Sequence, residues 1–288
     1  MNISVIICST VNRTEDLKKC IDSLLNADSS REIEIIVVCD NQFNKIISEI
    51  ADKYKEKIKI INAINKGLSI KRNKGIREAR NEIVAFLDDD VIVDNRWIHK
   101  MSEAYKEKNV GFAGGKIIPE FEQDIPKWLE EDIFVLGGFN YYEKGNKINE
   151  TRKIIGCNMS VKKEVFNRIG YFNEDFGRGA KKYSSGEEQE LFQRIRKMTG
   201  YQSFYKHDAI VTHKIQKERI NKEYIKERYY ELGYCNGGIT LLNSKVSVLK
   251  TYTKLLFSFI CYILNNSLRN YTAVNYNRGL LKAVTEDN

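Results

Sequence analysis

Residues 83–90 read Ile-Val-Ala-Phe-Leu-Asp-Asp-Asp, and this stretch says more about the fold than any other part of the chain. Its five apolar residues are typical of a strand buried on both faces of a parallel sheet. Asp88, Asp89 and Asp90 follow, and such carboxylates are costly to bury without partners. Ligands of open α/β sheets bind beyond the carboxyl ends of the strands, so the triplet could hold Mg²⁺ or Mn²⁺ and, through it, a phosphate. The alternative is a solvated turn that caps the next helix.

Strand-like and helix-like patterns alternate from the N-terminus to residue 106. Buried strands are expected at residues 3–8, 33–39, 58–61 and 83–87. Helical spacing of apolar residues follows the first two, a turn that opens a helix follows the third, and a last helix is expected at about residues 95–106. Four such repeats predict an α/β fold with a mostly parallel, right-handed sheet and helices on both faces.

Composition sets broad limits on function. The chain has 288 residues and a net charge of +8, which favours an anionic partner such as nucleic acid, acidic lipid or a phosphorylated metabolite. Its six cysteines form no C-x-x-C pair, so we expect neither a zinc site nor a disulfide framework, and the pattern fits a reducing compartment. No secretory signal pattern opens the sequence, and we therefore expect a cytoplasmic protein.

Polar residues that suit a nucleotide follow the predicted strands. Asp40 comes after the second strand and could accept hydrogen bonds from a base or ribose, or could cap a helix. Arg72 and Asn73 lie one turn into a helix that begins after Gly67, where free N–H groups and a guanidinium favour phosphate. The alternative for Arg72 is a surface salt bridge.

Four segments in this order resemble glycosyltransferase family 2. They read Val-Ile-Ile-Cys-Ser-Thr-Val-Asn-Arg at residues 5–13, Ile-Val-Val-Cys-Asp-Asn at 36–41, Asn-x-Gly-Leu-Ser-x-x-Arg-Asn-x-Gly at 65–75, and Phe-Leu-Asp-Asp-Asp at 86–90. Each motif is weak alone, whereas the ordered set is a strong signal. The resemblance implies the GT-A fold, which is Rossmann-like, and a nucleotide-diphosphate-sugar donor.

Later segments continue the resemblance to about residue 235. Residues 111–117 resemble the strand after the metal site, and residues 156–166 resemble the family's segment on the sugar side of the cleft. Residues 186–191, Gly-Glu-Glu-Gln-Glu-Leu, stand where relatives carry a catalytic acidic pair. Relatives commonly have Glu-Asp there, so Glu188 takes the place of the usual aspartate base, with Glu187 as the fallback. The alternative is a helix N-terminus rich in acids that suit its dipole.

The resemblance also implies roles for individual residues. The metal ligands are expected to be Asp90, Asp88 and His213, although a lone histidine near a strand can equally be structural. The expected donor-binding residues are Thr10, Asn12, Arg13, Asp40, Lys66, Gly67, Arg72, Asn73, Asp88 and Asp89. The implied reaction is a single displacement that inverts the sugar's anomeric centre, with UDP the favoured nucleotide.

Three parts are expected along the chain. Residues 1–115 form the nucleotide-sugar half, residues 116–218 the acceptor half with the catalytic base, and residues 219–288 a helical extension. Residues 246–264 approach the length of a membrane span, but Lys250 and Lys254 lie within them. A helix lying on a membrane surface and one packed on the catalytic domain or on a partner chain both remain open.

The acceptor is expected to be a glycan or a lipid-linked molecule, with peripheral contact to the cytoplasmic membrane face. Two other functions stay open. A catalytically silent GT-A module would bind sugar nucleotide without transferring sugar. A nucleic-acid-binding protein would need its basic residues on one face with interleaved aromatics, whereas here they are spread along the chain, so no nucleic-acid partner is expected.

Overall fold

The computed structural model describes residues 1–10, 13–27, 33–40, 45–63, 66–130, 132–137, 139, 147–148, 154–242 and 247–286. The chain forms two compact units. The first consists of residues 1–120, 138–173 and 191–214, and the second of residues 121–137, 174–190 and 215–288. The boundaries expected after residues 115 and 218 divide the chain by function, whereas these two units are defined by the contacts within each of them. The functional division therefore stays a prediction.

The first unit begins with the predicted alternation of strands and helices. Its parallel strands are β1 (Ile3–Ser9), β2 (Ile33–Cys39), β3 (Lys59–Asn62) and β4 (Ile83–Asp88), each within one residue of its expected ends. The helices between and after them are α1 (Thr14–Asn26), α2 (Lys45–Tyr54), α3 (Leu68–Glu78) and α4 (Trp97–Glu103), with short 3₁₀ turns η1 (Lys55–Lys57) and η2 (Ala104–Lys106). Both faces of β1 are buried from Ile3 to Ile7, as its unbroken apolar run indicated.

The register of these strands brings their carboxyl ends together. Strand β1 lies between β2 and β4, with Cys8 opposite both Val38 and Asp88. The residues that follow each strand, including Thr10 and Asp40, therefore lie near the same edge as the acidic triplet.

The remainder of the sheet is antiparallel where the pairing is defined, so the expectation of a mostly parallel sheet is wrong beyond β4. The added strands are β5 (Val91–Val93), β6 (Val110–Phe121), β7 (Lys147–Ile148), β8 (Asn158–Lys162) and β9 (Gln202–Ile215). In the described residues the order is β3-β2-β1-β4-β8-β6-β9-β5, and β7 pairs with β9. Strand β8 starts beside Leu87, where β4 is ending, so it runs back along β4 and needs no crossover helix.

A cluster of apolar side chains covers one face of this sheet. Helices α3, α6 (Lys163–Ile169) and α7 (Glu187–Met198) contribute to it together with inward residues of the strands. Phe112 and Phe192 stack with ring centroids 4.5 Å apart, and Phe86 and Phe172 form an edge-to-face pair with ring centroids 5.4 Å apart. This packing fixes the strand ends that carry the candidate site.

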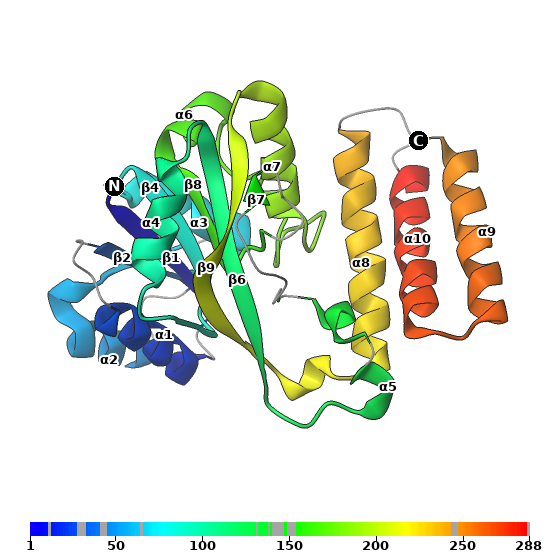
Figure 1. Cartoon of the computed structure of the whole chain (residues 1–288), viewed down its shortest axis with the longest axis horizontal. Helices are drawn as coiled ribbons and strands as arrows, with labels where there is room; N and C mark the ends of the chain where they lie inside the picture. Colours follow the sequence, from blue (N-terminus) through cyan, green and yellow to red (C-terminus); the bar gives the residue numbers. More distant parts are fainter. Residues whose placement is uncertain are drawn as a thin grey trace. The chain divides into compact units, whose positions relative to one another are not determined.

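The second unit is mainly helical. It contains α5 (Lys127–Glu130), η3 (Ile133–Leu136), η4 (Lys217–Arg219), α8 (Lys222–Leu241), α9 (Val248–Leu264) and α10 (Leu268–Glu286). Figure 1 shows α10 lying between α8 and α9, and α10 packs against both. Among the described residues, no helix combines the length and the apolar character needed to cross a bilayer.

Candidate active site

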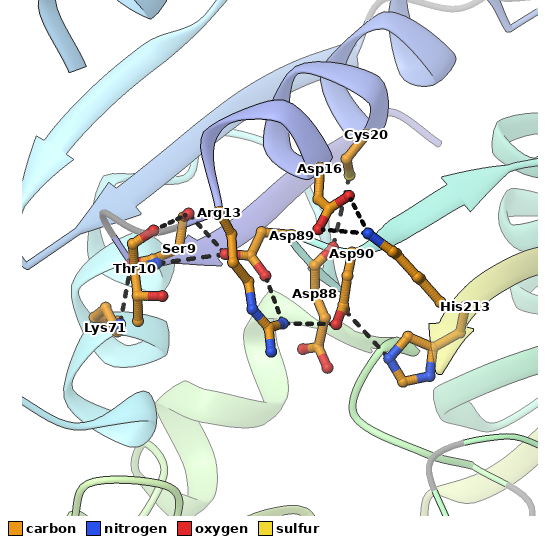
Figure 2. A network of polar contacts seen from close by, with 11 residues as sticks. Ser9, Thr10, Arg13, Asp16, Cys20, Lys71, Asp88, Asp89, Asp90 and His213 are labelled. Carbon is orange, nitrogen blue, oxygen red and sulfur yellow. Dashed lines mark hydrogen bonds and ion pairs between the residues drawn. The ribbon is translucent and has the colours of Figure 1, made fainter. Parts of the chain in front are cut away.

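The acidic triplet lies at the carboxyl end of β4. Asp88 is the last residue of β4, and Asp89 and Asp90 form the turn that leads directly into β5. Strand β5 pairs with β9 so that Val91 is opposite His213. The pairing brings Nε2 of His213 to 3.2 Å from Oδ1 of Asp90 (Figure 2).

Three of these side chains form a set of donors that suits a divalent cation. Asp88, Asp90 and His213 each offer one ligand atom, and the three atoms lie within 4.8 Å of one another. Asp90 and His213 are buried, whereas Asp88 is partly open to solvent. Two carboxylate oxygens and an imidazole nitrogen are ligands that Mn²⁺ accepts, and Mg²⁺ accepts the oxygens. The residues present therefore fit the expected cation.

Arg13 is the counter-charge of the triplet. Its Nη1 lies 2.6 Å from Oδ2 of Asp90 and 3.2 Å from Oδ1 of Asp89. Burial lowers the pKa of the Arg13 guanidinium, but the carboxylates of Asp90 and Asp89 outweigh burial and the pKa is raised overall. The guanidinium therefore stays charged and neutralises part of the acidic cluster.

Asp89 has a different role from its neighbours. Its Oδ2 accepts a hydrogen bond from Oγ of Ser9 at 2.7 Å and lies 3.4 Å from the backbone nitrogen of Thr10. Burial raises the pKa of Asp89, and the Ser9 hydrogen bond and the Arg13 charge offset this only in part. These contacts tie the loop after β1 to the end of β4 (Figure 2). Asp89 contacts Ser9, Thr10 and Arg13, and it is not one of the three grouped side chains that could hold a cation.

Lys71 is a residue of the site that the sequence did not single out. Its Nζ donates to the Ser9 carbonyl oxygen at 3.1 Å and pairs with Asp40 at 3.2 Å, so it joins the ends of β1 and β2. The available signal was its place one turn into the helix that begins after Gly67, directly before Arg72. Asp40 is half-buried and directly follows the end of β2, where a base or ribose is expected to bind.

Two predicted donor-binding residues are buried in the structure. Arg72 is 2% exposed, and its Cζ lies 5.7 Å and 5.4 Å from the ring centroids of Phe86 and Phe172. Asn73 exchanges two hydrogen bonds of 2.9 Å with the backbone of Phe172. Both fasten α3 to the core here, and their contact with a phosphate stays a prediction.

The remaining donor-binding candidates lie at the edges of this network. Thr10 and Lys66 are exposed, and Asn12 falls outside the described residues. Gly67 has φ of +138°, a conformation that favours glycine, at the start of α3. The thiols near the site do not compete as nucleophiles, because burial raises the pKa of Cys8 and of Cys39 to about 12.

Glu187 and Glu188 belong to the second unit and open helix α7. Glu187 is 5% exposed and Glu188 is half-buried. Gly186 precedes them with φ of +90° and lets the chain turn into the helix. Acidic side chains in the first turn of a helix suit its dipole, which is the alternative interpretation of this pair. A catalytic role for Glu187 or Glu188 stays a prediction.

Helix α8 holds the segment that leads to these acids. The rings of Phe176 and Tyr183 stack at 4.5 Å and pack on Cys235 and Ile239 of α8. A Cβ at Gly238 would lie 2.2 Å from Cζ of Tyr183, so only a glycine there allows this contact. Gly238 therefore serves packing that supports the acidic segment.

Comparison with known proteins gives the family. The model of Glycosyl transferase family 2 matches residues 4–170, which is more than half of the chain and includes the whole acidic triplet. The chain belongs to glycosyl transferase family 2. It is therefore a glycosyltransferase, and the resemblance noted in the sequence is confirmed.

Relatives and solved structures agree with this family. The glucosyl-dolichyl phosphate glucuronosyltransferase of Haloferax volcanii is 27% identical over 252 residues, which are 86% of this chain and 80% of that protein. The mannosyltransferase PcManGT of Pyrobaculum calidifontis, solved with GDP-Man and Mn²⁺, has a TM-score of 0.61 at 15% identity, covering 99% of this chain and 75% of PcManGT. TarS 1-349 of S. aureus has a TM-score of 0.58 at 15% identity, covering 99% and 83%. At this identity the two structures show the shared GT-A fold alone.

Proposed function

We propose that this glycosyltransferase moves a sugar from a nucleotide-diphosphate sugar, with UDP the favoured nucleotide, to a hydroxyl of a glycan or lipid-linked acceptor. The observation that carries the proposal is the cluster of Asp88, Asp90 and His213 at the carboxyl edge of the parallel strands. In a member of this family, two carboxylates and an imidazole at this edge of the sheet are suitable metal ligands for a site that binds a diphosphate through a cation.

Asp90, Asp88 and His213 would hold Mg²⁺ or Mn²⁺. When bound, the cation supplies Lewis-acid stabilisation of the charge that builds on the departing diphosphate. Asp40 and the loop from Thr10 to Arg13 would hold the base and ribose. Lys71 supports that loop through its hydrogen bond to the Ser9 carbonyl oxygen and its ion pair with Asp40.

Glu188 would act as the general base. The acceptor oxygen forms a bond to the anomeric carbon while the bond from that carbon to the diphosphate oxygen breaks. The hydroxyl proton passes to the carboxylate of Glu188, and the nucleoside diphosphate leaves with the bonding electrons. A single displacement of this kind inverts the anomeric centre, and base assistance contributes about 10²- to 10⁴-fold.

A relative that aligns with most of this chain supports this class of acceptor. The Haloferax volcanii protein is named for action on a dolichyl-phosphate-linked glucose, and it aligns with 86% of this chain. A polyprenyl-type lipid carrier is therefore the first acceptor to try. We place the reaction at the cytoplasmic face of a membrane.

The test uses a panel of nucleotide sugars with Mn²⁺ or Mg²⁺, scored by release of free nucleotide and by product formation. Asp90→Ala should lose metal-dependent donor binding. Glu188→Gln should keep donor binding and lose transfer by about 10²-fold or more. Glu227→Gln, at an exposed position of α8, is the control and should behave as wild type. Transfer at the native rate by Glu188→Gln would show that another group is the base.

A further inference from the structure

Helix α9 presents its apolar side chains to solvent. Nine of its large apolar side chains are more than a third exposed, among them Leu249 at 72%, Phe257 at 69% and Ile263 at 66%. The residues that α9 buries are Thr251 and Ser258, at 3% and 6% exposure. This is the reverse of an ordinary surface helix, which buries its apolar stripe and exposes polar groups.

Glycines make the close contacts between helices α8 and α10. A Cβ at Gly233 of α8 would lie 1.8 Å from the carbonyl oxygen of Tyr276 in α10. A Cβ at Gly279 of α10 would lie 1.9 Å from the carbonyl oxygen of Tyr230 in α8. Helices joined through small and hydroxyl side chains, with large apolar residues left outside, are typical of proteins whose outer face meets lipid.

The charge of this segment complements an anionic surface. Residues 247–285 contain five lysines and arginines and no aspartate or glutamate. Lys250 and Lys254 are exposed and lie four residues apart, so they form one row along α9 beside its apolar face. Basic side chains next to an inserted apolar face are placed to meet lipid phosphates.

The length of α9 favours an orientation along the surface. The helix has 17 residues, which span about 25 Å, less than the about 30 Å of a bilayer's hydrocarbon core. Its two lysines fall in the first half of the helix, where a spanning segment would carry them into the hydrocarbon. A helix that lies in the headgroup region avoids this cost.

We propose that α9 docks the protein onto the surface of an anionic phospholipid bilayer, with its apolar face among the upper acyl chains and Lys250 and Lys254 at the phosphates. A second copy of the chain is the weaker occupant. Residues 247–285 of such a copy would offer Lys250 and Lys254 no carboxylate to pair with. The proposal is independent of the sugar-transfer mechanism, because its test does not use activity.

The experiment is flotation of the full chain with vesicles of phosphatidylcholine alone and of phosphatidylcholine with one quarter phosphatidylglycerol. The wild type should float with the anionic vesicles and less with the neutral ones. The double substitution Phe257→Ser and Ile263→Ser should lower the bound fraction about tenfold or more, because two large apolar groups lose their burial in lipid. Lys250→Glu with Lys254→Glu should remove the preference for anionic vesicles.

Controls separate docking from unfolding and from self-association. Met198→Ser changes a side chain of 61% exposure in the first unit and should leave flotation unchanged. Circular dichroism melting should be the same for all variants, because the altered side chains are exposed. Failure of the wild type to float, or flotation unaffected by the α9 substitutions, would overturn the proposal. So would a wild-type dimer by light scattering that the serine variant abolishes without any vesicle binding, because it would assign the face to a second copy.

Discussion

Removal of the Arg13 guanidinium should destabilise the protein and make it more dependent on a divalent cation. In Arg13→Gln the carboxylates of Asp89 and Asp90, whose side chains are 6% and 1% exposed, lose their cationic partner. Breaking a fully buried ion pair in this way costs about 3–5 kcal/mol. Arg13 is itself 22% exposed, and Ser9 continues to donate to Asp89, so we expect about 2–3 kcal/mol.

The assay is thermal unfolding with and without Mn²⁺. A loss of this size lowers Tm by about 4–12 °C in a chain of this length. Mn²⁺ should then raise the Tm of Arg13→Gln by more than it raises that of the wild type, because the cation replaces the missing counter-charge and binds the folded state alone. Lys18→Gln removes an exposed pair with Glu15 on α1 and should leave both measurements unchanged.

Two results would refute this reasoning. An unchanged Tm for Arg13→Gln would mean that the carboxylates are not held as charged groups by the guanidinium. A lower Tm with the same Mn²⁺ response as the wild type would mean that the cation does not bind at these carboxylates.

Two further predictions concern the scaffold. Glu34 accepts hydrogen bonds from Ser4 and from the backbone N–H of Arg80, and although burial raises its pKa, these bonds and the Arg80 charge hold the pKa below the ordinary value of 4.5. Glu34→Gln should therefore lose about 1–2 kcal/mol of stability at pH 7, and denaturant melts should show that the difference fades as the pH falls below about 4.5. Gly238→Ala would place a Cβ 2.2 Å from the Tyr183 ring and displace the segment before α7. Steady-state kinetics should therefore show slower sugar transfer, while the affinity for UDP with Mn²⁺ stays unchanged. Gly200→Ala is the control and should be neutral, because its Cβ would meet open space.

Strands β1 to β4 could be predicted because each is an apolar run, with β1, β2 and β4 inside the sheet and β3 at its edge. Residues buried on both faces leave an unbroken pattern, and parallel strands need helices between them, so the parallel direction of these strands follows from the alternation. The later strands lack this alternation. Which strand β8 joins depends on contacts between β4 and a segment some seventy residues later, and no local pattern records that pairing.

The acids of the candidate site were predicted from a local pattern, whereas His213 was expected beside them only from the family resemblance. The acids at the end of β4 follow a recognisable strand, but the contact of Asp90 with His213 depends on β5, whose three residues are too few to show periodicity. Lys71 and Arg72 are neighbours in sequence and point about 100° apart on α3. The packing of the helix turns Lys71 toward the strand ends and Arg72 toward the core.

Titration of UDP into the protein by calorimetry, with and without Mn²⁺, tests the central claim most directly. We expect Mn²⁺ to strengthen UDP binding to the wild type at least tenfold, and this gain to disappear in Asp90→Ala while it persists in Glu188→Gln. An Asp90→Ala protein that binds UDP with the same Mn²⁺ dependence as the wild type would contradict the assignment of the acidic triplet as the donor's metal site.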